Sequence, residues 1–404
     1  MEHLLPKYYQ PLKTKKEPKN DLSEWEKAKK LYEEKSFKKA IIAVFNYNNK
    51  NTLKGVDLTK DINITRFHGD IALDISIDNS ELTLSAKMVS IDKDTNVIAL
   101  LRRVAEINFA LLDYVSITFE NNLLSMNYGE KIDRCKPVKV NWVLREILFA
   151  GDEHTNEFIE KYNAKSLSLV KKEELTTAQQ EKALKAIRGY LSEYDSYVDY
   201  FENNGSSSYV WDIALITLYK ISNMSYLNGY LKYELITKIS ILNNEKIEFK
   251  DKLIEAKKYI KSLQEKSDEF YLERMFFRED IISLLKISSV DILKEYLGGY
   301  FDSLAKYENE QNDFAKVYYL QVIFLRVIYN YNISAYQKKQ IEKALRRIAK
   351  DNIKKGSENL IILYNRFMRK EIKEKYTFKF TTANILYLLL LGIISVDAIK
   401  ALFK

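Results

Sequence analysis

The chain has 404 residues, with 64 Lys or Arg, 56 Asp or Glu and a formal net charge of +8. Apolar residues make up 46% and charged residues 30%, which excludes a largely disordered chain and predicts a well-formed core. The length favours two or three packed units. The single cysteine, Cys135, excludes an intrachain disulfide, a multi-thiolate zinc site and an iron-sulfur cluster, and it favours a reducing compartment.

Residues 1–20 are predicted to form a basic, mobile tail. Pro6, Pro11 and Pro18 interrupt this segment, which lacks the apolar stretch of a secretory signal. Together with the single cysteine, this composition predicts a cytoplasmic protein.

The strongest apolar run lies near the other end, at residues 385–396 (ILYLLLLGIISV). It is shorter than the roughly 20 residues that a transmembrane helix needs, and Asp397 and Lys400 close it. We expect a buried terminal helix. The alternative is a membrane-associating end.

Residues 22–46 are predicted to form a helical hairpin. Ser23 is placed as an N-cap, and two runs of apolar residues at helical spacing are separated by a break at Lys35 and Ser36. With the small residues Ala28 and Ala40 where two helices meet, the segment resembles one tetratricopeptide unit.

Apolar positions alternate twice between residues 71 and 88, which predicts two strands joined by a turn at Asp78-Asn79-Ser80. Helical spacing follows over residues 94–107, and a second hairpin is predicted from Val115, Ile117, Phe119 and the alternation after them. Pro137 then introduces another helix.

The predicted order is therefore strand, strand, helix, strand, strand, helix over about residues 64–162. This order, with Leu100, Leu101, Asn108 and Phe109 before the second hairpin, resembles the class I type III secretion chaperones and the bacterial sensory-transduction-regulator family. The resemblance implies that sheet and helix surfaces clasp an extended segment of a secreted protein, usually as a homodimer. We therefore expect the partner-binding residues Leu82, Leu84, Met88, Val115 and Phe119 on two hairpins that leave at least one free sheet edge. The partner segment would bind at that edge or on the helix surface beside it.

From Thr176 onward the sequence predicts an all-α region. No proline follows Pro137, and the apolar spacing is three and four. About seven helices are expected, as an irregular bundle or short solenoid, with breaks at residues 203–208, 243–244, 298–299, 330–332 and 356. The expected fold is thus α+β, with a tail (1–20), an α+β domain (21–165) and a helical domain (176–404).

Residue types that could carry catalysis or bind a metal do not converge in this sequence. His68 is expected at a strand edge, and Asp70, Asp74 and Asp78 share the solvated face of one strand, too far apart for one ion. Gly298 and Gly299 are read as a helix terminator rather than a phosphate loop. Cys135 is expected to be a plain thiol. No catalytic residue, metal or cofactor is therefore predicted, and the protein is expected not to be an enzyme.

Residues 338–379 contain 14 Lys or Arg and 5 Asp or Glu, a formal +9 that exceeds the net charge of the whole chain. Ile341, Leu345 and Ile348 are predicted to form the inward stripe of a helix. The opposite side would present a basic surface of Lys343, Arg346, Arg347, Lys350 and Lys354. Such a surface suits a solvated face or an acidic protein partner, or alternatively nucleic acid or an anionic membrane surface.

These observations together predict a non-enzymatic protein-binding module, a chaperone or adaptor for a partner polypeptide or a secreted one. Two alternatives remain open. One is a structural component of a larger cytoplasmic assembly, with tyrosine-rich helix faces as interfaces. The other is a nucleic-acid-associated protein that uses the basic surface.

Overall fold

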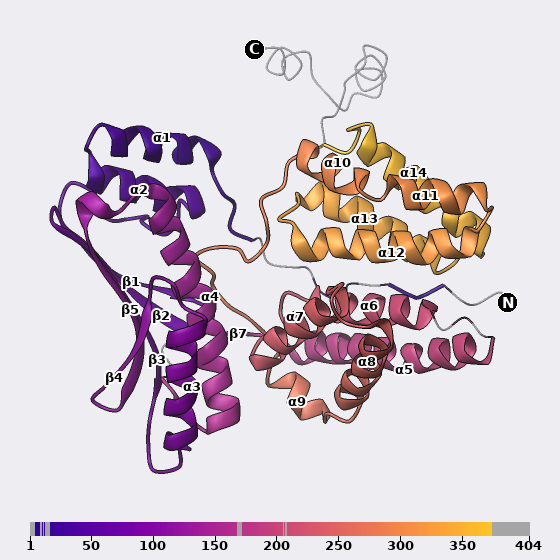
Figure 1. Cartoon of the computed structure of the whole chain (residues 1–404), viewed down its shortest axis with the longest axis horizontal. Coiled ribbons are helices and arrows are strands. Elements are labelled where there is room, and N and C mark those ends of the chain that lie inside the picture. The colour runs from indigo at the N-terminus through magenta and orange to yellow at the C-terminus, as the bar shows by residue number, and fades with distance from the viewer. Residues whose placement is uncertain are drawn as a thin grey trace, which may run out of the picture.

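The computed structural model of the chain describes residues 5–8, 10, 12, 17–167, 172–204, 206 and 208–373. It is an α+β protein, as predicted. A helical hairpin leads into a small antiparallel sheet with two covering helices, and a helical region follows (Figure 1). The sheet and the helical region lie side by side, with the long helix α4 facing the helical region.

The predicted helical hairpin consists of α1 (Leu22–Glu33) and α2 (Phe37–Asn48). Its N-cap is Asp21, not Ser23, because the Asp21 carboxylate accepts the backbone N–H of Ser23 at 3.0 Å. Lys35 occupies the left-handed turn with a φ of 58°. Ala28 and Ala40 are both fully buried, so the small side chains lie where the two helices approach.

The sheet has the strand order β1-β2-β3-β5-β4, and all of these pairs are antiparallel. The four predicted strands are present, and a further strand, β1, precedes them. The bounds are β1 (Ile62–His68), β2 (Ile71–Ile77), β3 (Glu81–Ser90), β4 (Ser116–Glu120) and β5 (Leu123–Lys131). A two-residue strand, β6 (Lys165–Ser166), pairs with the end of β3. The edge strands are therefore β1 and β4, whereas β3 lies in the centre.

The two faces of the sheet differ as the alternation predicts. One face is covered by α3 (Val97–Ala110) and α4 (Pro137–Tyr162), which follows the short helix η1 (Ile132–Arg134). The other face carries a polar ladder, in which Thr65 donates to Asp74 and Asn127 links Ser85 to Thr118 across three strands. The core of this domain therefore lies between the sheet and the two helices.

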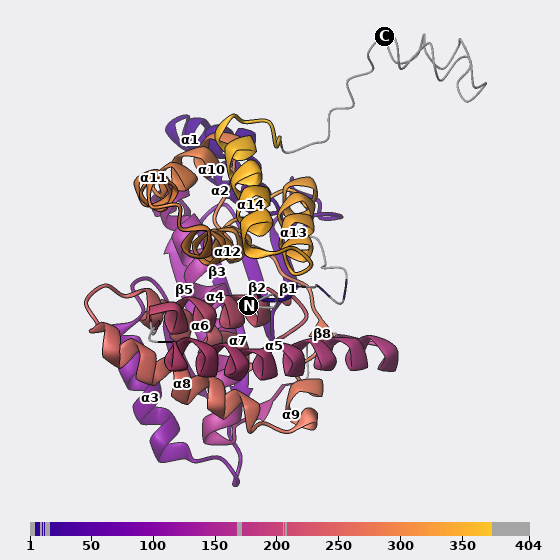
Figure 2. The same cartoon turned by 90° about the vertical axis from the view of Figure 1, so that its right-hand side faces the viewer.

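The helical region is built in two layers (Figures 1 and 2). One layer contains α5 (Thr177–Asn203), α6 (Ser208–Ser222), α7 (Tyr230–Asn243), α8 (Phe249–Gln264) and α9 (Asp268–Leu272). The other contains α10 (Val290–Gly298), α11 (Phe301–Asn309), α12 (Asp313–Asn330), α13 (Ala335–Ile348) and α14 (Ile353–Met368). Helices α6 and α12 pack against each other between the layers. Two-residue strands β7 (Glu173–Glu174) and β8 (Phe276–Phe277) pair beside them.

The described residues of this region form ten helices, more than the seven expected. The break predicted at residue 356 is wrong, because Gly356 lies inside α14. A Cβ atom there would lie 2.9 Å from Leu5 Cδ1, so the glycine makes room for the N-terminal segment rather than ending a helix. The predicted end at Gly298 is confirmed.

Two segments cross between the halves of the chain. Leu5, Tyr8 and Leu12 are buried in the core of the helical region, so the prediction of a mobile tail is wrong at these described positions. Ile281 and Ile282 are buried in the core of the α+β domain, although they follow β8 in the helical half. Each core therefore includes side chains that the linear domain boundaries assign elsewhere.

No helix among the described residues is both long enough and apolar enough to cross a membrane. The terminal helix predicted at residues 385–396 lies outside the described residues.

Candidate functional site

Four of the five predicted partner-binding residues are core residues. Leu82, Leu84 and Met88 are fully buried on β3, and Val115 is only 7% exposed. For Leu82, Leu84 and Met88 the prediction of a partner contact at a sheet edge is wrong, because β3 pairs on both sides and the covering helices occupy the apolar face. Strand β4, which carries Phe119, is an edge strand. Phe119 alone is exposed. Alternation shows that one face is apolar, but it does not show whether a partner or the chain itself covers that face.

The edge strand β4 is closed by two side chains. The Asn108 carboxamide accepts the backbone N–H of Ile117 at 2.8 Å and donates to the Ile117 carbonyl oxygen at 2.9 Å. The Glu146 carboxylate accepts the N–H of Val115 at 3.2 Å and also those of Asp113 and Tyr114. Because alternate residues of an antiparallel edge strand point outward, these bonds satisfy most of the outer side of β4. Strand addition there is therefore blocked at Val115 and Ile117.

Around these bonds, the α+β domain exposes large apolar side chains from α3, the α3–β4 loop, β4 and α4. We call this set the α3–α4 patch; it consists of Phe109, Leu111, Tyr114, Phe119, Val138 and Trp142. Phe109 is 92% exposed and Trp142 is 57% exposed. Trp142 lies one helical turn before Glu146, whose carboxylate binds the backbone at Tyr114, so the α4 part of the patch lies near the α3–β4 loop.

A bidentate ion pair holds the two helices of the patch together. Arg103 on α3 contacts Glu157 on α4 through Nε to Oε1 at 3.1 Å and Nη2 to Oε2 at 3.3 Å. His154 Nδ1 also lies 2.9 Å from Glu157 Oε2, and since a carboxylate only accepts, the histidine is the donor. Burial alone would raise the pKa of Glu157, but His154 and Arg103 outweigh it and lower the pKa to about 2.

This arrangement predicts acid sensitivity of the α3–α4 contact. The pKa of Glu157 is lower in the folded state than its ordinary value of 4.5, so its contribution to stability is complete above about pH 4.5 and is lost as the pH falls toward 2. Between about pH 5 and pH 2, the parent should lose about 2–3 kcal/mol more unfolding free energy than Glu157→Gln. Urea denaturation at each pH measures the difference, and parallel acid profiles would contradict the assignment.

Cys135 and His68, the residues considered for catalysis, are both buried. Cys135 is buried with its Sγ 3.4 Å from the Lys131 carbonyl oxygen, and burial raises its pKa to about 11, so the thiol stays protonated. His68 is the last residue of the edge strand β1, as expected, and its side chain is buried. Among the described residues, no group of three or more His, Cys, Asp or Glu side chains could hold a metal ion.

The predicted basic residues are exposed, but they do not share one helix. Lys343, Arg346 and Arg347 lie on α13, Lys350 lies in the following turn and Lys354 on α14. Ile341, Leu345 and Ile348 form the buried stripe, as predicted. Arg346 is 3.7 Å from Glu342 and Arg347 is 3.9 Å from Asp351, so part of the charge is paired within the chain. An anionic partner for this surface stays a prediction.

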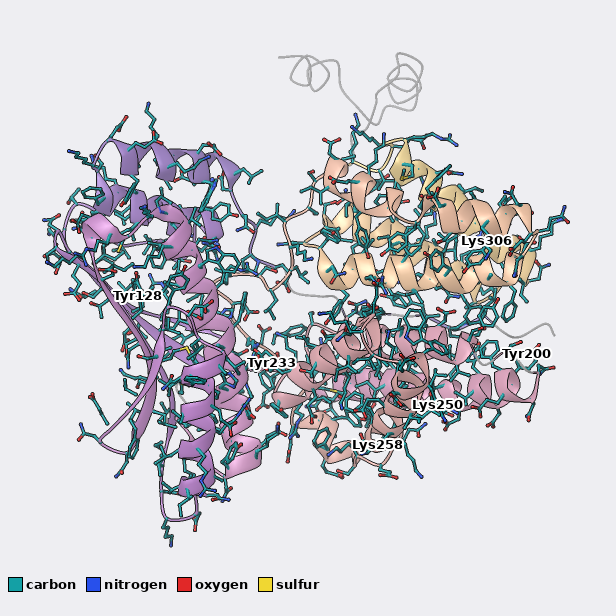
Figure 3. All side chains as sticks on the ribbon, viewed as in Figure 1. Tyr128, Tyr200, Tyr233, Lys250, Lys258 and Lys306 are labelled. Atoms are coloured by element: carbon teal, nitrogen blue, oxygen red, sulfur yellow. The ribbon has the colours of Figure 1, made fainter. Side chains whose placement is uncertain are left out.

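A buried charge network, which the sequence did not reveal, joins the two halves. Asp152 on α4 is fully buried and contacts Arg278 through Nη2 at 2.5 Å and Nη1 at 3.1 Å. The Tyr233 hydroxyl on α7 also donates to Asp152, and Figure 3 shows Tyr233 at the junction facing α4. Asp70 completes the network, 3.3 Å from Arg278. The network positions the α+β domain against the helical region.

No protein-family model, no curated protein and no solved structure matches this chain. The resemblance to secretion chaperones therefore stays a prediction, and any function must be argued from the geometry.

Proposed function

We propose that this chain is a non-enzymatic, cytoplasmic adaptor that binds an extended segment of a partner polypeptide on its α3–α4 patch. The observation that carries the proposal is the exposure of Phe109 and Trp142 on α3 and α4, two helices that pack against each other. Isolated exposed apolar side chains are common, but a contiguous patch rich in aromatic residues is typical of protein-binding surfaces.

The charges around the patch favour a basic partner segment over a second copy of this chain. Asp113 and Glu120 are exposed at its rim, and Glu146 lies beside its centre. Arg102, the nearest exposed basic residue on α3, lies two helical turns from Phe109, and Lys136 is the exposed basic residue beside Val138 at the start of α4. Two copies facing each other would bring these carboxylates together, whereas a segment with apolar residues flanked by Lys or Arg would complement them.

The surface is also organised before binding. The Arg103–Glu157 pair fixes α3 on α4, and Asn108 fixes the end of α3 on β4. A surface that is already ordered loses little conformational freedom when a partner binds, so its apolar area contributes more fully to affinity.

The test is a site-specific cross-link from the exposed aromatic residue. A photoreactive phenylalanine analogue at position 109 should cross-link, in the native cell, to one apolar and basic segment of one partner, identified by peptide mass spectrometry. Phe109→Asp with Trp142→Asp should weaken binding of that segment about a hundredfold, because each hot-spot side chain contributes about 1–2 kcal/mol or more.

Ile254→Asp is the matched control, since Ile254 is 55% exposed on α8, outside the patch, and gains the same charge. Undiminished binding by the folded double variant would contradict the proposal. If position 109 cross-links only to a second copy of this chain, sedimentation should show a dimer that the double variant abolishes. The patch would then be a homodimer interface, and not the binding site of another protein.

A further inference from the structure

A cavity of about 630 Å³ lies at the junction of the α+β domain with both layers of the helical region. Its wall is formed by the end of β1, the α6–α7 loop, the start of α7, the end of α12 and the segment that connects β8 to α10. The volume is within the range of small-molecule sites, about 300–1,000 Å³. The cavity is separate from the α3–α4 patch and plays no part in the proposed adaptor function.

Lys232 on α7 supplies an ammonium group to this cavity without a matching acceptor. No carboxylate oxygen lies within 4.0 Å of its Nζ and no hydrogen bond is formed to it, across all residues that the structure describes. Its Nζ lies 5.9 Å from the centre of the Tyr233 ring. Burial lowers the pKa of Lys232, and the Arg278 charge acts in the same direction, against the carboxylates of Asp280, Asp152 and Glu17. An anion in the cavity would satisfy donors that the protein leaves open.

His68 provides a second donor at the same cavity. Its Nδ1 accepts the backbone N–H of Ile281 at 3.0 Å, so the neutral ring carries its proton on Nε2. Within the described chain, Nε2 has no hydrogen-bond partner. Burial lowers the pKa of His68, which keeps the ring neutral and its Nε2–H available as a donor.

The remaining wall is largely apolar, with four lysines and two carboxylates at its charged positions. The lysines are Lys19, Lys232, Lys286 and Lys338, and the carboxylates are Glu17 and Asp280. Glu17 is held by the Ser283 hydroxyl at 2.8 Å. Met224, Leu227, Ile236 and Ile328 are among the apolar side chains. The cavity thus combines a net positive charge with space for an apolar body.

We propose that this cavity binds a small amphipathic organic anion, with a carboxylate or phosphate head on Lys232 Nζ and His68 Nε2–H and an alkyl body against the apolar wall. A carboxylate and a phosphate are treated as equivalent head groups, because both present anionic oxygens to the same donors. The ligand would lie between the two halves of the chain and would stabilise their contact.

Titration calorimetry with octanoate and with octyl phosphate tests the proposal. The control ligand is 1-octanol, which has the same alkyl chain but no charge. One or both anions should bind at one site at millimolar concentration or below, and 1-octanol should bind at least about tenfold more weakly. Lys232→Met should weaken anion binding by about tenfold or more, whereas Lys258→Met, an exposed position on α8 (Figure 3), should leave it unchanged.

A second variant, with the opposite expected effect on anion binding, tests the proposal if Lys232→Met does not fold. Glu17→Gln removes a negative charge from the wall and retains an oxygen for Ser283, so it should tighten anion binding several-fold. The proposal is overturned if neither anion binds, if 1-octanol binds as tightly as the anions, or if a folded Lys232→Met or Glu17→Gln variant binds them like the parent.

Discussion

Replacing Arg278 by methionine is expected to lower the free energy of unfolding by about 3–5 kcal/mol. The reason is that Asp152 is fully buried, and Arg278 is its only cationic partner within 4.0 Å among the described residues. Burial alone would raise the pKa of Asp152, and the Arg278 charge reverses this, so the pKa is about 2. Without the guanidinium group, an ionised carboxylate would stay buried with the Tyr233 hydroxyl and backbone or amide donors alone.

Urea denaturation followed by tryptophan fluorescence measures the effect, since Trp25 and Trp142 lie in the α+β domain and Trp211 in the helical region. Lys87→Met is the control. Lys87 pairs with Asp74 on the open face of the sheet, so its loss should change stability by only about 0–1 kcal/mol. Adding Asp152→Asn to Arg278→Met should recover part of the loss, because the uncompensated charge is removed. Equal stabilities of parent and Arg278→Met would refute the role of the network.

Replacing Gly69 by alanine is expected to destabilise the protein by about 3 kcal/mol or more, through two effects. The residue has a φ of +59°, which L residues adopt at a penalty of about 1–2 kcal/mol. A Cβ atom would also lie 2.1–2.5 Å from the Asp152 carboxylate atoms. The carboxylate would have to move, and its contacts with Arg278 and with the Asp70 N–H, now 2.7 Å, would be lost.

Gly55→Ala separates these two effects. Gly55 has a φ of +80°, but apart from its chain neighbours no atom of the described residues lies within 4 Å of the Cβ position, so only the backbone penalty applies. Gly69→Ala should therefore be less stable than Gly55→Ala by about 2 kcal/mol or more, measured by the same denaturation. Similar losses for the two variants would mean that Asp152 accommodates the methyl group, contrary to this prediction.

The main features of the fold follow from local sequence patterns. Alternation at Ile71–Ile77 and Leu82–Met88 predicted β2 and β3, helical spacing predicted α3 and α13, and the absence of proline after Pro137 predicted the long helices. These predictions succeed because the side-chain period of a strand or helix depends on its own backbone geometry. Short helices such as α9 were not predicted, since they carry too few turns to show a period.

The candidate sites could not be predicted in the same way. The sequence pattern gave Phe109 a place only in the resemblance to secretion chaperones and did not predict that it is exposed. Its exposure depends on how α3 lies over α4 and β4. Leu82, Leu84 and Met88 illustrate the opposite case, because an apolar strand face is the same pattern whether a helix or a partner covers it. Asn108 closes the edge of β4 through a contact that no pattern in the sequence indicates.

By itself, the sequence determined the α+β class, the helical hairpin, the polar and apolar faces of the sheet and the buried stripe of α13, because each depends on residues within a few positions of one another. Only the tertiary structure decided that the N-terminal segment packs in the helical core, that Ile281 and Ile282 return to the α+β core, and that Asp152 meets Arg278. Those contacts join residues more than a hundred positions apart, and they depend on which apolar surfaces and charges become buried together when the whole chain folds.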